Sequence, residues 1–403
     1  MANEQAGMKT GLLFMIDTLE GGGAQKILLY LLEHLDRTKF AVSLLVLEKK
    51  ENSPFVLPED VNVTYAFGQG GKRSAGLWSL YRGFRTRLSL RLFRKYPSCF
   101  SCLVGIPERY DIGISFCEGL NTPLLWTKKK QFQTRVSWIH TDLQRHWPQE
   151  KRVRFLQHMA VLDGLFFVSN DSKRAFQACL PDPHSLDSKL KVVYNPIDST
   201  AIRKQAEPAI NPTKRAPLQV LAIGRLSEEK RFDRLLNVHR RLLEAGLVHE
   251  LLLLGEGDQR PQLEEQIRSL QIASSCELLG FRNPYPYLSQ TDVLALTSDY
   301  EGMPLVICEA MVLCKPIVAT RITGTGELLE DGKYGLLVEC SEEALYQGLK
   351  KMLEDASLRD YYRQVLAENQ DRFVFSSDLK VIEEQLLELT KEGSVAAPSN
   401  NSH

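Results

Sequence analysis

The sequence predicts an α/β protein with two domains, each built on a doubly wound parallel sheet. A chain of 403 residues exceeds the usual size of one domain, and 43% of its residues are hydrophobic, which is enough for two cores. Apolar runs of strand length alternate with helical patterns, an order that places parallel strands between layers of helices. A proline-containing stretch separates the two series of strands and marks a domain boundary.

The first domain, residues 1–200, opens with a strand, a glycine-rich turn and a helix. Residues 10–18 form an apolar run, and residues 24–35 repeat apolar positions at helical spacing. Between them, Gly22 and Gly23 would let the backbone approach a ligand closely, although a tight strand-to-helix turn would use the same glycines. Further strands are expected at residues 40–47, 61–65, 110–116, 133–139, 162–168 and 191–194.

A basic segment from Lys72 to Lys95 interrupts this series of strands. It carries Lys and Arg residues but no acidic residue. Its apolar and its arginine side chains fall on different helical faces, which suits a helix lying on an anionic membrane. A helix packed on its own sheet with a solvated basic face would give the same periodicity. The absence of acidic residues favours contact with a membrane or a polyanionic acceptor.

The second domain, residues 217–375, follows a linker expected at residues 201–216. Its strands are expected at 218–224, 250–255, 276–280, 292–297, 316–320 and 335–339, alternating with helices. An amphipathic helix at 376–391 is expected to cross back to the first domain. The polar tail, 392–403, is expected to be disordered.

Bulk composition narrows the class of protein. Fifty basic and fifty acidic residues give a formal net charge of zero, so attraction to nucleic acid is not indicated. No run reaches the roughly eighteen apolar residues that a membrane span needs, and the N-terminus does not resemble a signal peptide. Eight scattered cysteines, with Cys99 and Cys102 as the one close pair, favour reduced thiols in a cytoplasmic protein over a redox or zinc site.

The most informative stretch is residues 298–311. It follows an expected buried strand, and Pro304 suits the first turn of a helix, so Glu301 should lie in the loop and Glu309 inside the helix. A helix start beyond a parallel strand attracts anions, and an acidic residue beside it would accept hydroxyl or amino groups attached to a phosphate. Glu309 could accept from the vicinal hydroxyls of a ribose. The other candidate contacts are Gly302, Met303, Pro304 and Leu305.

Other expected strand ends add charged and aromatic candidates. Arg225 and Lys230 share one loop, where two fixed cations would stabilise the charge that grows on a departing diphosphate. No Asp-x-Asp lies at a strand end to hold a metal. His140 follows a strand and should face the crevice. The remaining candidates at strand ends are Gly257, Phe281 and Arg282.

These motifs resemble the retaining, nucleotide-sugar-dependent family-four glycosyltransferases of the GT-B fold. The resemblance rests on the stretch from Glu301 to Met311 followed by Lys-Pro-Ile-Val-Ala-Thr, on Gly-Arg-Leu-x-x-x-Lys at 224–230, and on Trp-Ile-His-Thr-Asp at 138–142. Cys314 departs from the family, which usually has Gly there.

The resemblance implies a role for each candidate. Glu301 and His140 would contact the donor sugar, and Glu309 the nucleotide ribose. Arg225 and Lys230 would hold the diphosphate without a metal, and Glu301 would position and stabilise charge, not form a covalent intermediate. Gly257 would lie near the nucleotide. The glycine turn would cover the diphosphate and the acceptor, and the base would meet Phe281 and Arg282.

The expected activity is transfer of a hexose or N-acetylhexosamine from a nucleotide diphosphate sugar, with UDP preferred and GDP open. The acceptor would be a hydroxyl of a glycan or polyprenyl-linked glycan in bacterial surface polysaccharide biosynthesis. The protein would be cytoplasmic and peripheral on the inner face of the cell membrane, with no cofactor besides this co-substrate. The alternatives are a nucleotide-sugar epimerase and a catalytically silent GT-B scaffold or membrane-binding subunit.

Overall fold

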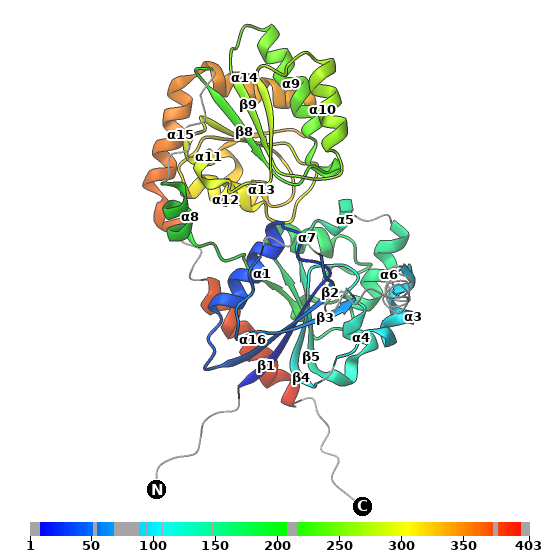
Figure 1. Cartoon of the computed structure of the whole chain (residues 1–403). Helices are drawn as coiled ribbons and strands as arrows, with labels where there is room; N and C mark the ends of the chain where they lie inside the picture. Colours follow the sequence, from blue (N-terminus) through cyan, green and yellow to red (C-terminus); the bar gives the residue numbers. More distant parts are fainter. Residues whose placement is uncertain are drawn as a thin grey trace, which may run out of the picture.

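The protein has two domains, stacked one above the other in Figure 1. This computed structural model describes residues 9–50, 55–67, 89, 91–93, 95–106, 108–146, 149–207, 216–373 and 378–395. The lower domain in Figure 1 contains the N-terminal strands, in blue to cyan, and the upper domain contains the strands drawn in green to orange. Two parallel sheets with helices confirm the predicted fold class.

The N-terminal domain holds a seven-stranded sheet in the order β3-β2-β1-β4-β5-β6-β7, in which every pairing is parallel. Its strands are β1 (Thr10–Ile16), β2 (Phe40–Glu48), β3 (Asn62–Phe67), β4 (Tyr110–Phe116), β5 (Phe132–Ile139), β6 (Gly164–Phe167) and β7 (Leu190–Val192). Its helices include α1 (Gly23–His34), α3 (Pro97–Phe100), α4 (Leu124–Thr127), α5 (Leu143–His146), α6 (Gln149–Met159), α7 (Asn170–Gln177) and α8 (Ser199–Ala206).

The C-terminal domain repeats this arrangement with six parallel strands in the order β10-β9-β8-β11-β12-β13. Its strands are β8 (Gln219–Ile223), β9 (Glu250–Leu254), β10 (Cys276–Gly280), β11 (Val293–Leu296), β12 (Ile317–Thr320) and β13 (Leu336–Val338). Its helices include α9 (Phe232–Glu244), α10 (Arg260–Ser269), α11 (Tyr285–Gln290), α12 (Leu305–Val312), α13 (Thr325–Leu328), α14 (Glu342–Glu354) and α15 (Ala356–Glu368).

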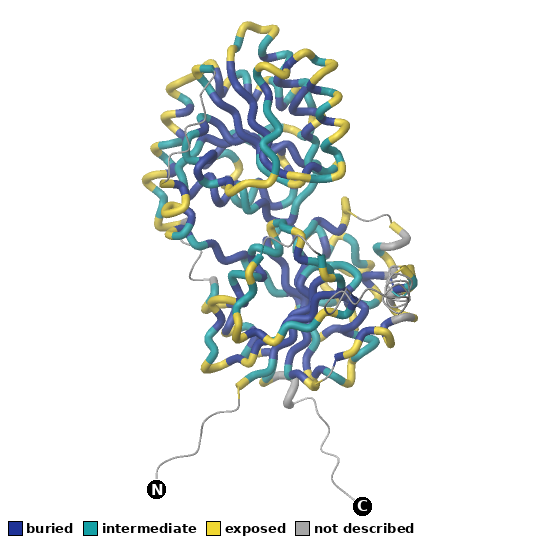
Figure 2. Tube along the Cα trace, in the orientation of Figure 1, coloured by how far each residue is buried: buried dark blue, intermediate teal, exposed yellow. Residues whose placement is uncertain are grey.

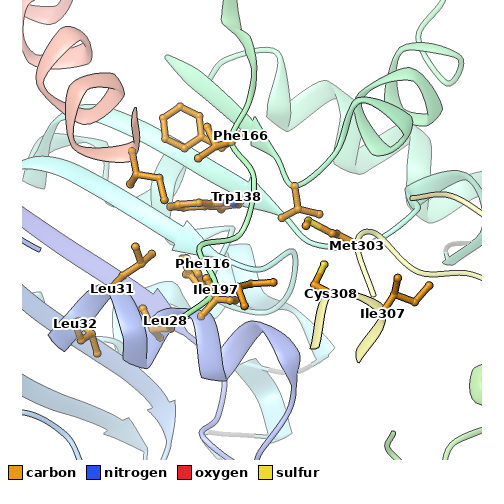
Figure 3. Close-up of a cluster of buried hydrophobic side chains, with 14 of the residues drawn as sticks. Leu28, Leu31, Leu32, Phe116, Trp138, Phe166, Ile197, Met303, Ile307 and Cys308 are labelled. Carbon is orange, nitrogen blue, oxygen red and sulfur yellow. The ribbon is translucent and has the colours of Figure 1, made fainter. Parts of the chain in front are cut away.

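Both sheets are buried on both faces, which explains why their strands are continuously apolar. In β1, Leu12 and Phe14 face one core cluster, whereas Leu13 and Met15 face another. The dark blue strands in Figure 2 follow this pattern in both domains. One hydrophobic cluster continues from one domain into the other. It includes Trp138 of the N-terminal domain and Met303 and Ile307 of the C-terminal domain, which are labelled in Figure 3.

Several segment limits differ from the expectation. The expected linker begins inside α8, which starts early because the Asp198 side chain accepts the N–H of Ala201 at 2.7 Å. The expected disordered tail is wrong for residues 392–395, because helix α16 (Asp378–Val395) includes them; residues 396–403 lie outside the described residues. Most of the basic segment Lys72–Lys95 also lies outside them, although Phe93 near its end is buried in the N-terminal core. No helix in the described part of the chain is both long and apolar enough to cross a membrane.

Helix α16 returns from the C-terminal domain and packs on strands β4 and β5. Glu383, in this helix, is 6% exposed and accepts the backbone N–H of Asp36 at 2.8 Å and Lys39 Nζ at 2.7 Å. Its buried carboxylate therefore holds the turn between α1 and β2 against the last helix of the chain.

We expect Glu383→Ala to destabilise the N-terminal domain by about 1–3 kcal/mol, because it leaves the N–H of Asp36 without its acceptor. Glu388→Ala, on the same helix, removes an exposed pair with Lys191 and should change stability by less than about 1 kcal/mol. Urea unfolding followed by hydrogen exchange of α1 and α16 measures both effects. Equal effects of the two variants would contradict the role assigned to Glu383.

Candidate functional site

The candidate site lies where the carboxyl ends of the two sheets face each other. In open parallel sheets, ligands bind beyond the carboxyl ends of the strands, near the point where the strand order reverses. That point lies between β1 and β4 in one domain and between β8 and β11 in the other. The loops that follow these strands carry most of the predicted site residues.

Glu301 and Lys230 form an ion pair in the loops after β11 and β8. Lys230 Nζ donates to Glu301 Oε1, and Ser298 Oγ donates to the same oxygen at 2.9 Å. The Glu301 and Lys230 side chains are 17% and 19% exposed, so the pair is largely, but not fully, shielded from water. The structure thus brings together the two residues predicted for the donor sugar and the diphosphate.

Arg225 is an exposed cation without a hydrogen-bond or ion-pair partner for its guanidinium among the described residues. Its Nη2 would lie 3.4 Å from a Cβ placed on Gly22, in the glycine turn of the other domain. A Cβ on Gly23 would lie 3.2 Å from Leu305 Cδ1, at the start of α12. The glycine turn, Arg225 and the start of α12 therefore converge across the cleft.

Glu309 is buried inside α12, as predicted, and faces the N-terminal domain. Its Oε1 accepts Lys26 Nζ at 3.1 Å and the Tyr285 hydroxyl at 3.2 Å. Burial, and then the charge of Glu309, raise the pKa of Tyr285. Pro304 does not lie in the first turn: it is the residue before α12, with an extended backbone, and its C=O accepts the N–H of Ile307 at 3.0 Å.

The remaining candidates of the C-terminal domain have different surroundings. Phe281 follows β10 and is 59% exposed, so its ring is open to stacking. Arg282 donates to Leu279 O at 3.0 Å and to the Tyr287 hydroxyl at 2.8 Å. Gly257 precedes α10 without beginning it, and a Cβ there would lie 2.3 Å from Leu226 O, so close backbone packing requires this glycine.

His140 lies directly after β5, as predicted. Burial lowers the pKa of its ring to about 3, so the imidazole is neutral at physiological pH. Its Nε2 is buried and has no hydrogen-bond partner among the described residues. A Cβ on Gly302 would lie 2.2 Å from His140 O, so the loop of Glu301 touches the backbone of the N-terminal domain here. Met303, next in that loop, is 6% exposed and packs in the interdomain core.

Sequence reasoning missed Glu118, in the loop after β4. Its Oε2 accepts the backbone N–H of His140 at 2.8 Å. Burial, together with the charge of Asp17, raises the pKa of Glu118 to about 7. The signal was present, since Glu118 follows an expected strand, as His140 does, but a single acidic residue in a polar loop carries no motif.

Sequence reasoning also missed a polar joint between the domains, made of Asp171 and Glu327. Glu327, in α13, accepts the backbone N–H groups of Asn170 at 3.2 Å and Asp171 at 3.0 Å, at the start of α7. In return, Asp171 Oδ2 accepts the N–H of Gly324 at 3.0 Å, just before α13. Each side chain thus accepts backbone N–H groups of the other domain, a pairing that no local sequence pattern predicts.

Comparison with known protein families finds a match for part of the chain, mostly in the C-terminal domain. Residues 203–368 match the family described as glycosyl transferases group 1. One relative, an N-acetylgalactosamine-N,N'-diacetylbacillosaminyl-diphospho-undecaprenol 4-alpha-N-acetylgalactosaminyltransferase of Campylobacter jejuni, is 35% identical over 178 residues, 43% of this chain and 47% of the relative. The amylovoran biosynthesis glycosyltransferase AmsD of Erwinia amylovora is 31% identical over 38% of this chain and 43% of its own length. The chain therefore matches about half the length of these relatives.

Solved structures extend the likeness of fold to nearly the whole chain. Anabaena HepE in complex with UDP and glucose aligns with a TM-score of 0.67 and 19% identity, over 94% of this chain and all of its own. Sucrose-phosphate synthase from Thermosynechococcus elongatus aligns with a TM-score of 0.71 and 16% identity, over 96% of this chain. At such low identity the comparison establishes the two-domain fold.

We expect Gly302→Ala to push the two domains apart, because the new methyl group would lie 2.2 Å from the backbone oxygen of His140. Small-angle scattering should then show a larger radius of gyration and thermal unfolding a lower midpoint. Gly105→Ala is the matched control, because a Cβ at Gly105 would meet nothing within 4 Å. An unchanged scattering curve for Gly302→Ala would refute the close contact.

Proposed function

We propose that the chain transfers a sugar from a nucleotide diphosphate to a hydroxyl of a glycan or lipid-linked glycan, because residues 203–368 match the family described as glycosyl transferases group 1. The observation that carries this proposal is Arg225, whose guanidinium stands unpaired among the described residues beside Gly22. An unpaired cation at a glycine turn, facing a helix start, fits a diphosphate. Lys230 supplies a second cation in the same loop.

The donor that best fits this site is a UDP-sugar. Glu309 and Tyr285 form a buried acceptor and hydroxyl pair of the kind that binds ribose hydroxyls, and Phe281 offers an exposed ring for the base. UDP and glucose occupy HepE, which shares the fold. In this structure Lys26 Nζ donates a hydrogen bond to Glu309. When ribose binds, its hydroxyl groups would take the place of the Lys26 ammonium as donors to Glu309.

In the proposed chemistry, charged side chains that are already in position before the reaction stabilise the charges that develop during it. As the bond between sugar and phosphate breaks, negative charge grows on the leaving diphosphate, where Arg225 and Lys230 would stabilise it without a metal. Lys230 would then share its charge between Glu301 and the phosphate. Glu301, held by Ser298, would position the donor sugar and stabilise its developing positive charge. Attack from the face of departure would retain the anomeric configuration.

The acceptor is proposed to bind the N-terminal domain. The Campylobacter relative is named for an undecaprenol-diphosphate-linked acceptor, and the Erwinia relative for amylovoran biosynthesis, so a lipid-linked glycan of a surface polysaccharide is the acceptor class we propose. Attachment to the inner face of a membrane through Lys72–Lys95 is inferred from the charges in the sequence. Transfer is favoured over epimerisation because these relatives are named as transferases. It is favoured over a silent scaffold because the sequence retains Arg225, Lys230, Glu301 and Glu309 together.

We expect one nucleotide among UDP, GDP and ADP, with UDP favoured, to bind the wild type in calorimetric titration. Arg225→Ala should weaken that binding roughly ten- to a hundredfold, the value of one charged hydrogen bond to phosphate. Arg240→Ala, which removes an exposed arginine paired with Glu244, serves as the control and should leave binding unchanged. Failure of all three nucleotides to bind the wild type would overturn the proposed function.

We expect Glu301→Gln to lower turnover about 10²–10³-fold while changing nucleotide affinity only a few-fold, because the lost charge acts on the transition state. Steady-state release of the nucleotide from its sugar measures the first quantity and calorimetry the second. Glu264→Gln, on α10, removes an exposed partner of Arg260 and serves as the control. Turnover equal to that of the wild type would remove Glu301 from the chemistry.

A further inference from the structure

The loop after β4 is held rigidly and presents one carboxyl group. Cys117 begins it at φ 108°, a conformation that costs a non-glycine residue energy and persists only where surrounding contacts enforce it. Asp17, after β1, supplies those contacts by accepting the N–H groups of Leu120 and Asn121, each at 2.9 Å. A Cβ on Gly119 would lie 2.5 Å from Asp17 Oδ2, so glycine is required there.

Glu118 is the carboxyl group that this loop presents, and the structure does not neutralise it. Its Oε2 accepts the backbone N–H of His140, and no Lys, Arg or His side chain among the described residues pairs with it. Burial and nearby Asp17 raise the pKa of Glu118 to about 7. Holding this carboxylate ionised therefore costs stability, and a neutral glutamine would accept the same N–H without that cost.

A second unpartnered polar group lies on the next strand end. His140 Nε2 is buried and makes no hydrogen bond to any described residue. Glu118 and His140 each stand two residues beyond the register pair of Phe116 and Trp138, so they are neighbours across β4 and β5. A carboxylate group and a ring nitrogen that lie side by side with unused hydrogen-bonding capacity match a ligand that carries hydroxyl groups.

This pair faces the donor site from the other domain. The backbone of His140 touches Gly302, the residue after Glu301, where the two domains meet. Glu118 accepts the N–H of His140, so it lies on the N-terminal side of this contact, and Glu301 and Lys230 lie on its C-terminal side.

We propose that Glu118 accepts a hydrogen bond from the attacking hydroxyl of the acceptor sugar and so orients the hydroxyl oxygen toward the donor sugar. His140 Nε2 would bind a hydroxyl group beside it. This inference rests on the proposed function. The carboxylate only orients the nucleophile: the new C–O bond forms as the bond between sugar and phosphate breaks, and the proton of the hydroxyl leaves with the departing diphosphate. An oriented hydroxyl reacts faster because its approach is no longer random.

The test compares transfer with hydrolysis. With a UDP-sugar donor and octyl glycosides of glucose, galactose and N-acetylgalactosamine as acceptor probes, Glu118→Gln should lower transfer roughly ten- to a hundredfold. Hydrolysis of the donor by water and calorimetric UDP binding should remain within about twofold of wild type. Glu33→Gln, an exposed glutamate on α1, is the control. In thermal unfolding above pH 7, Glu118→Gln should be at least as stable as the wild type. If Glu118 were purely structural, the variant would instead unfold at a lower temperature.

A measurement on the wild type needs no variant. The ratio of transfer to hydrolysis should fall as pH drops through about 7, because protonation removes the negative charge of Glu118 and turns one of its oxygens into a donor. The titratable groups near Glu118 are Asp17 after β1, Cys117 in its own loop and His140 after β5, and the last is neutral throughout this range. Unchanged transfer in Glu118→Gln, equal loss of transfer and hydrolysis, or a pH-independent ratio would each overturn the proposal. Failure of the glycosyltransferase proposal would appear instead as wild-type protein that neither binds UDP nor hydrolyses the donor.

Discussion

The structure depends on how closely the backbone of the C-terminal domain approaches the end of β5. Gly302 has no side chain, its carbonyl accepts Ser169 Oγ at 2.9 Å, and a methyl group there would overlap His140 O. This contact places the loop of Glu301 against the N-terminal domain. The reciprocal hydrogen bonds of Asp171 and Glu327 add to this contact, because each side chain accepts backbone N–H groups of the other domain, while Ser169 caps α7 from within its own domain.

Within this frame, the cleft balances most of its own charges. Lys230 neutralises Glu301, and Lys26 neutralises Glu309, one pair lying in the C-terminal domain and the other crossing between domains. Among the described residues of this region, Arg225 and Glu118 have no partner of opposite charge; Asp17 has none either, but its carboxylate accepts the N–H groups of Leu120 and Asn121. Unbalanced groups in a shielded site cost stability, so their presence is better explained by ligands than by folding. The cation fits a phosphate and the anion fits a hydroxyl.

Local patterns predicted the fold class and nearly every strand, because parallel strands buried on both faces are short apolar runs that stand out from polar loops. They also placed Glu301, Glu309 and His140 on the correct elements. Partners far apart in sequence were beyond this reasoning: Lys26 with Glu309 and Glu118 with His140 meet only after both sheets have formed. Helix α6 was missed because its sequence is dominated by charged and polar residues and carries no clear apolar stripe.

The return of α16 to the first sheet has a consequence for dividing the molecule. Its side chains Ile382, Leu386 and Leu389 are buried in the large core cluster, and Thr134 of β5 donates to Leu389 O at 3.3 Å. A fragment ending at residue 207 would contain the whole N-terminal sheet in sequence but would leave this face of it uncovered. The N-terminal domain is therefore completed by a segment that follows the C-terminal domain in sequence, so a cut between the two domains would remove part of the first.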